Sequence, residues 1–245
     1  MTDIQNRLAS LADPEFRNFH TRLIPTVSPE RVLGVRTPAL RALAKEISHD
    51  PDNCRAFLDD LPHRFYDEDQ LHAVIISGMR DTCQVMTELE KFLPYVDNWA
   101  TCDIISPSCF KNDVQPVHDF CHDTLIPFSS SPVPPDMVYT VRFAVNMLMK
   151  FFLCDRLEEW MPDAVASLVC TEDNERFPRA AYYLDMGAAW YFATALAYNR
   201  GDILPYLSER GRLRDTVRRV AVRKSIESYR IDAGTKAYLR ENLKG

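Results

Sequence analysis

The sequence predicts an all-α protein, an α-solenoid in which helix pairs stack on one another. Glycine is scarce: seven in 245 residues is under half of the average share of about 7%, too few for the turns of a many-stranded protein. Apolar residues recur at helical spacing, as at Leu40, Leu43, Ala44 and Ile47. Prolines recur along the chain, but its composition does not change at any of them. We therefore expect a single domain over residues 1–245.

The prolines mark where helices begin and end. Six follow a residue whose side-chain oxygen can cap a helix, and they predict helix starts at Asp13-Pro14, Ser28-Pro29, Thr37-Pro38, Asp50-Pro51, Ser106-Pro107 and Ser131-Pro132. Four close an apolar stretch and predict helix ends at Leu61-Pro62, Leu93-Pro94, Ile126-Pro127 and Leu204-Pro205. Between these marks we expect about a dozen helices of ordinary length.

Composition excludes several classes of protein. Hydrophobic residues make up 46% and charged residues 26%, the balance of a soluble globular protein. No apolar run approaches the roughly 20 residues that cross a bilayer. The chain has no GxGxxG or GxxxxGK[ST] loop, so nucleotide-binding folds are not expected. Seven cysteines without a CxxC pair, and six histidines without ligand spacing, predict reduced thiols in a cytoplasmic protein without a metal.

Charge is unevenly distributed along the chain. The net charge is −6, but residues 1–45 hold seven basic and four acidic groups, and residues 200–245 hold twelve basic and six acidic groups. The middle, residues 46–199, holds ten basic and twenty-five acidic groups. The two ends of the chain can therefore form a basic surface although the total is acidic.

Trp99 and Asp103 are the first candidate pair. Four residues apart on a helix, they lie about 40° from each other on one face. An aromatic plane beside a carboxylate suits a cationic, planar or sugar-like ligand. The alternative is a core tryptophan with a capping aspartate.

Arg142 lies in an apolar stripe that should face the core. A buried guanidinium keeps its charge, so we expect a carboxylate or phosphate beside it, and Asp103 is one candidate. A structural salt bridge and a ligand-binding residue are both compatible with this position. In the aromatic segment 179–197, Gly187 precedes Trp190 by three residues, which predicts space beside the indole, although such aromatic stripes are usually core.

The segment 210–230 carries a basic stripe. Arg219, Arg223 and Arg230 fall within about 40° on a helical wheel. Such a stripe suits a phosphate backbone, and a solvated surface is the alternative.

Five short motifs, in order, resemble the AlkD-like family of DNA alkylation repair proteins, which are built of HEAT-like repeats. They are Leu33-Gly34-Val35-Arg36-Thr37-Pro38, Asn98-Trp99 to Asp103, Arg142-Phe143-Ala144-Val145, Tyr182-Tyr183-Leu184-Asp185-Met186-Gly187-Ala188-Ala189-Trp190, and Lys224-Ser225-Ile226-Glu227-Ser228-Tyr229-Arg230. Each motif is weak alone, but together they run over nearly the whole chain.

The resemblance implies a DNA glycosylase that acts on N3- or N7-alkylated purines. It implies Asp103 as the catalytic carboxylate, with Trp99, Arg142 and Trp190 binding the substrate. Arg219, Arg223 and Arg230 would bind the DNA backbone. It implies double-stranded alkylated DNA as the partner, a monomer, and no cofactor. Family members are thought to act without extruding the base.

Two features depart from the family pattern. Ala100 stands where active members commonly have a second acidic residue. The segment Leu23-Ile24-Pro25-Thr26-Val27-Ser28-Pro29 resembles a branch that lacks a short substrate-contacting helix. The alternative function is therefore a non-catalytic helical scaffold that binds DNA or protein.

Overall fold

The computed structural model describes residues 1–209 and 211–242. Within these ranges the chain consists of helices and connecting turns, with one isolated antiparallel bridge between Ala12 and Val35. The predicted all-α fold is confirmed. Arg210, where the basic segment 210–230 begins, lies outside the described residues. None of the described helices combines the length and the apolar character that a membrane crossing requires.

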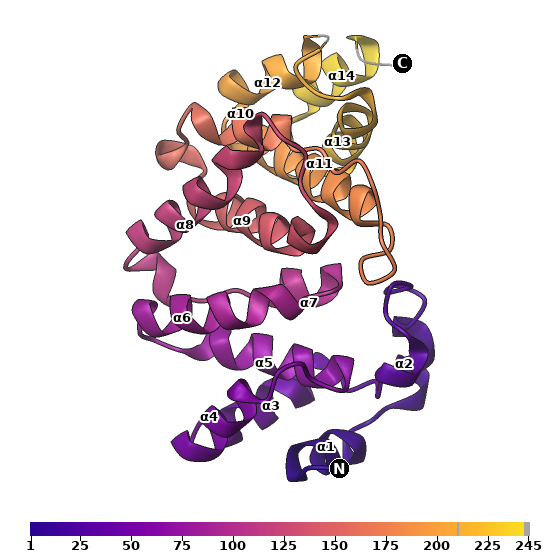
Figure 1. Cartoon of the computed structure of the whole chain (residues 1–245). Coiled ribbons are helices and arrows are strands. Elements are labelled where there is room, and N and C mark those ends of the chain that lie inside the picture. Colours follow the sequence, from indigo (N-terminus) through magenta and orange to yellow (C-terminus); the bar gives the residue numbers. More distant parts are fainter. Residues whose placement is uncertain (210, 243–245) are drawn as a thin grey trace. The chain divides into compact units, whose positions relative to one another are not determined.

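The chain divides into two compact units, Met1–Pro116 and Val117–Gly245 (Figure 1). The first holds α1 (Asp3–Ser10), α2 (Pro14–His20), α3 (Thr37–Ile47), α4 (Pro51–Asp59), α5 (Tyr66–Gly78), α6 (Thr82–Phe92) and α7 (Trp99–Ile104). The second holds most of α8 (Gln115–Leu125), then α9 (Val138–Phe151), α10 (Trp160–Ser167), α11 (Ala180–Tyr198), α12 (Arg200–Ser208), α13 (Asp215–Glu227) and α14 (Ala233–Asn242). Single 3₁₀ turns stand at Pro29–Arg31, Leu93–Tyr95, Cys109–Lys111, Ile126–Ser129, Pro135–Met137 and Cys154–Arg156.

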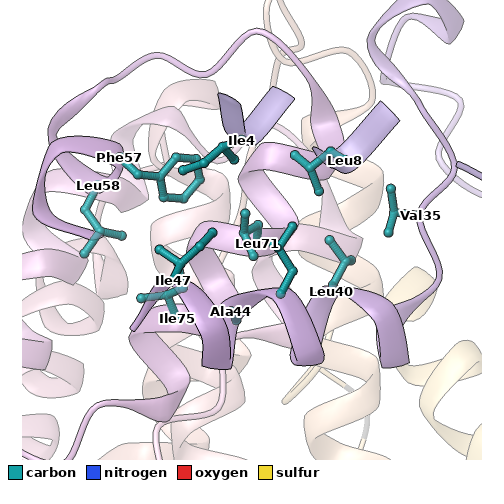
Figure 2. Close-up of a cluster of buried hydrophobic side chains, with 11 residues drawn as sticks. Ile4, Leu8, Val35, Leu40, Ala44, Ile47, Phe57, Leu58, Leu71 and Ile75 are labelled. Atoms are coloured by element: carbon teal, nitrogen blue, oxygen red, sulfur yellow. The ribbon is translucent and has the colours of Figure 1, made fainter. Parts of the chain in front are cut away.

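The core of the first unit forms where α1, α3, α4 and α5 meet. Figure 2 shows the buried side chains Ile4, Leu8, Val35, Leu40, Ala44, Ile47, Phe57, Leu58, Leu71 and Ile75 directed toward one another. The predicted stripe of α3 supplies three of them, because its apolar residues recur on one face. Each large aliphatic side chain buried in this way contributes roughly 1.5–3 kcal/mol.

The second unit is organised around α11, which packs against α9 on one side and α13 on another. A helix covered on several sides has no polar face, and α11 buries residues around most of its circumference, Tyr191 and Phe192 among them. The predicted aromatic segment is therefore largely core, as the alternative interpretation expects. Tyr182 and Trp190 are its exposed members.

Most of the predicted boundaries are confirmed. Asp13 and Asp50 cap α2 and α4, and their side chains accept hydrogen bonds from the backbone N–H of Phe16 and Asn53. Ser106-Pro107 does not start a helix, because the first turn forms only at Cys109. Ser131-Pro132 does not start one either, because further prolines keep the chain extended up to Pro135.

The predicted end at Leu204-Pro205 is wrong, since Pro205 lies inside α12. Proline removes a backbone donor from a helix and normally interrupts it. Here Ile203, Tyr206 and Leu207 on both sides of the proline are buried. Tertiary packing therefore continues the helix through a residue that disfavours it.

Two histidines lie inside the first unit. His63 Nε2 and His72 Nδ1 are 2.8 Å apart and share a hydrogen bond. His63 stacks on Phe57, and His72 stacks on Phe92 with ring centroids 4.0 Å apart. Burial lowers the pKa of His63 to about 4 and that of His72 to about 2. Both rings are therefore neutral in the folded protein at neutral pH.

We expect acid to destabilise the fold through this pair. In the unfolded chain these histidines bind protons near pH 6.5, whereas in the folded chain they do not. The contribution of the pair to the free energy of unfolding is therefore complete above pH 6.5 and is lost as the pH falls toward 4. For His63 alone the loss at pH 5 is about 2 kcal/mol. Urea unfolding at pH 7.5, 6 and 5 measures it. The free energy of unfolding of His63→Leu should depend less on pH than that of wild type, whereas His49→Leu, at an exposed position, should behave as wild type. The same pH dependence in wild type and both variants would disprove this account.

Candidate functional site

The first turn of α5 fixes the segment that precedes α3. The carboxylate of Asp67 accepts hydrogen bonds from the backbone N–H groups of Leu33, Gly34 and Val35 at 2.6, 3.1 and 2.7 Å. Burial raises the pKa of Asp67, and the three N–H groups act in the opposite direction. Gly34 has φ +91°, and a Cβ there would lie 2.5 Å from Cβ of Arg17. Only glycine fits this position.

Arginine side chains fix the adjoining segment 29–32. Arg31 forms ion pairs with Asp69 of α5, at 3.0 Å, and with Asp97 just before α7. Burial raises the pKa of Asp69 well above its usual range, while the charge of Arg31 opposes this rise. Arg17 donates from Nε to the carbonyl of Val32 at 2.6 Å and from Nη2 to the carbonyl of Pro29 at 2.7 Å. The segment is therefore held by side chains on both of its flanks.

The start of α7 is anchored to α5. Asn98 caps the helix, since its Oδ1 accepts a hydrogen bond from the backbone N–H of Thr101 at 2.8 Å. The Thr101 hydroxyl accepts from Asn98 Nδ2 at 3.0 Å and from Gln70 Nε2 at 2.8 Å. These buried polar contacts set where the following turn presents its side chains.

Trp99 and Asp103 both lie on α7, as predicted, and both side chains are half-buried. The indole Nε1–H of Trp99 donates to the carbonyl of Leu23 at 3.0 Å. Trp99 and Ala100 also pack against a cluster formed by Ile24, Val27, Val32 and Tyr66. Leu23 and its neighbours Ile24 and Val27 therefore contact the candidate tryptophan directly.

Asp103 lies in the last turn of α7, whose ends are capped by Asn98 and Ile105. Four residues after Trp99, it lies on the same side of this helix. The first unit thus brings an indole and a carboxylate together on one short, firmly anchored helix.

Arg142 lies on α9 and is only 5% exposed. Its Nη1 donates to the backbone carbonyl of Tyr183 on α11 at 2.7 Å. A Cβ placed on Gly187 would lie 3.2 Å from this Nη1 and 3.4 Å from Cγ of Arg142. The space at Gly187 therefore accommodates Arg142 rather than the indole of Trp190, which corrects the expectation from spacing. The pairing of Arg142 with Asp103 stays a prediction.

Trp190 lies one turn after Gly187 and is 41% exposed. Large aromatic side chains are usually more deeply buried, and an exposed one suits a binding surface. Both the carbonyl that accepts the hydrogen bond from Arg142 and the exposed indole of Trp190 therefore belong to α11.

The predicted basic stripe is shorter than the sequence indicates. Arg219 and Arg223 are exposed on α13, which packs against α11. The helix ends at Glu227, so Arg230 lies beyond it and the helical wheel does not apply to this residue. Its guanidinium lies 5.5 Å from the ring centroid of the neighbouring Tyr229.

Sequence reasoning missed the residues that build the site, namely Leu23, Arg31, Asp67, Asp69 and Gln70. An acidic first turn on a helix normally indicates solvent exposure and a favourable interaction with the helix dipole. The one available signal was the run of polar residues that opens the otherwise apolar α5. Across the described ranges, no group of three or more His, Cys, Asp or Glu side chains is placed to hold a metal ion.

Comparison with known proteins identifies one family. The model of the family described as DNA alkylation repair enzyme matches residues 4–161, which is more than half of the chain. No curated protein and no solved structure matches the chain.

We expect Gly187→Ala to destabilise the second unit. The added methyl group would press on the Arg142 guanidinium and its hydrogen bond to Tyr183, at a cost of about 1–3 kcal/mol. Gly201→Ala is the matched control, since a Cβ there meets no atom within 4 Å; it should be neutral or stabilising by up to about 1 kcal/mol. Urea denaturation of the three proteins measures both effects. Equal stability of the two variants would contradict the close packing at Gly187.

Proposed function

The chain belongs to the family of DNA alkylation repair enzymes, and we propose that it binds duplex DNA and hydrolyses the N-glycosidic bond of cationic N3- or N7-alkylated purines. The observation that carries this proposal is the placement of Trp99 and Asp103 on one side of α7: both side chains are half-buried, and the start of the helix is held to α5 by the hydrogen bond between Gln70 and Thr101.

The chemistry suits a carboxylate. An alkylated purine carries a positive charge, so the electron pair of the breaking C1′–N9 bond neutralises the departing base. The deoxyribose becomes oxocarbenium-like, and water adds at C1′. Asp103 stabilises the developing cation and orients or deprotonates this water, as carboxylates do in glycoside hydrolysis.

Aromatic side chains position the sugar in this proposal. The Trp99 N–H is already bonded to Leu23, so Trp99 offers the face of its ring, which attracts a cationic sugar. Trp190 supplies a second exposed indole, and Arg142 binds a backbone phosphate in this proposal.

Exposed arginines supply affinity for the DNA backbone. Arg219, Arg223 and Arg230 are all exposed and follow the acidic middle of the chain. Their charges would replace counterions condensed on the duplex. All seven cysteines carry free thiols, which suits the cytoplasm as the compartment.

A non-catalytic DNA-binding scaffold is the second candidate. Two observations favour it: Ala100 provides no carboxylate beside Trp99, and the segment 23–32 packs on this part of α7. Salt-dependent binding of DNA without release of a base would support this candidate.

We expect Asp103→Asn to lower the rate of base release by at least about 100-fold, because removing preorganised charge stabilisation has effects of this size. Release of 7-methylguanine and 3-methyladenine from methylated DNA under single-turnover conditions measures the rate. Asp113→Asn, at an exposed position of the same unit, should keep the wild-type rate. An Asp103→Asn protein as active as wild type, or a wild type inactive on both bases, would rule out the glycosylase mechanism.

We expect the double variant Arg219→Gln/Arg223→Gln to reduce the salt dependence of DNA binding. Loss of two phosphate contacts should lower the slope of log K against log salt concentration by about two. Fluorescence anisotropy over a range of KCl concentrations measures the slope. Arg156→Gln, which removes an exposed arginine elsewhere in the second unit, should leave it unchanged, and the same slope in the double variant would exclude α13 from the interface.

A further inference from the structure

The end of α2 and the turn that follows it present an unusual surface. Phe19 is 59% exposed and Leu23 is 43% exposed, and Arg22 between them is also exposed. We call these three residues the α2 tip. The backbone N–H groups of Leu23 and Ile24 both donate to the carbonyl of His20, so the chain makes one further turn after the helix.

The α2 tip has a fixed position. The carbonyl of Leu23 accepts the hydrogen bond from the Trp99 indole at 3.0 Å. His20, between Phe19 and Arg22, contacts the Tyr66 hydroxyl on α5 at 2.7 Å, and its ring stacks on Phe16. The exposed side chains are therefore held beside Trp99 by the backbone and by His20, without using any atom of their own side chains.

The charge of the α2 tip is available for a ligand. Within the described residues, Arg22 makes no hydrogen bond, ion pair or ring contact. Between Pro14 and Val27 the chain has two arginines and a single acidic residue, Glu15. The other arginine, Arg17, is occupied by backbone carbonyls. An unpaired guanidinium flanked by apolar side chains is complementary to a phosphate with its adjoining sugar.

We infer that the α2 tip is a DNA-contacting element that binds the strand next to the lesion. Arg22 binds a backbone phosphate, and Phe19 and Leu23 pack against deoxyribose and base edges, as apolar side chains do in minor-groove binding. This inference rests on the proposed function for the DNA partner, because the tip adjoins Trp99. It assigns an active binding role to the segment in which the chain departs from its family.

The test is an anisotropy titration of the full chain with a fluorescein-labelled duplex that carries one 7-methylguanine, at several KCl concentrations. Arg22→Gln should weaken binding several-fold and lower the log–log salt slope by about one. Phe19→Ser/Leu23→Ser should weaken binding by about tenfold with an unchanged slope, because apolar contacts release no counterions. The Leu23 carbonyl that holds Trp99 remains in both variants.

Matched controls lie in the same unit. Arg55→Gln removes an exposed arginine of α4, and Leu11→Ser removes a leucine that is 41% exposed; neither should change binding. Urea unfolding should show wild-type stability for all variants, since every altered side chain is exposed.

The outcomes separate this inference from the proposed function. Wild-type binding in the tip variants, or losses equal to those of the controls, would overturn the α2 tip alone. Weaker binding by the tip variants together with no base release by wild type would support the tip and overturn the glycosylase. No binding of the duplex by wild type at low salt would overturn both, and would point to a protein partner for this surface.

Discussion

The buried polar turn that opens α5 is the constraint on which the first unit depends. Four successive residues each hold a different segment: Asp67 the backbone of residues 33–35, Glu68 the Gln5 amide of α1, Asp69 the guanidinium of Arg31, and Gln70 the Thr101 hydroxyl of α7. Consecutive helical residues point about 100° apart, so one turn reaches neighbours on all sides. Buried carboxylates are costly unless they are fully hydrogen-bonded, and this cost makes the arrangement specific.

The position of Trp99 follows from this turn. Gln70 fixes the start of α7, and Asp67 and Asp69 fix residues 31–35. Leu23, which precedes this segment, accepts the hydrogen bond from the Trp99 indole. Ile24 and Val27 belong to the buried cluster on which Trp99 packs, and Ala100 packs on the same cluster.

In the second unit a single glycine determines how a candidate residue is positioned. Gly187 lets α11 approach the guanidinium of Arg142, which is then held by the Tyr183 carbonyl on the same helix. A charged group is thereby kept in a nearly closed environment. Electrostatic interactions are stronger there than in bulk water, so the hydrogen bond to the Tyr183 carbonyl contributes more than it would at the surface.

The sequence by itself determined most of the helices and the placement of Trp99 and Asp103 on one side of a single helix, because periodicity, caps and spacing along one helix are local properties. Tertiary structure decided what those residues contact. The hydrogen bond between Trp99 and Leu23 joins residues 76 positions apart, and no local pattern encodes such a bond. Packing also continued α12 through Pro205 and buried the acidic first turn of α5, which by its sequence resembles a solvated turn. It placed the Arg142 side chain against Gly187. In each case the free energy of burial and buried hydrogen bonds outweighed a local preference.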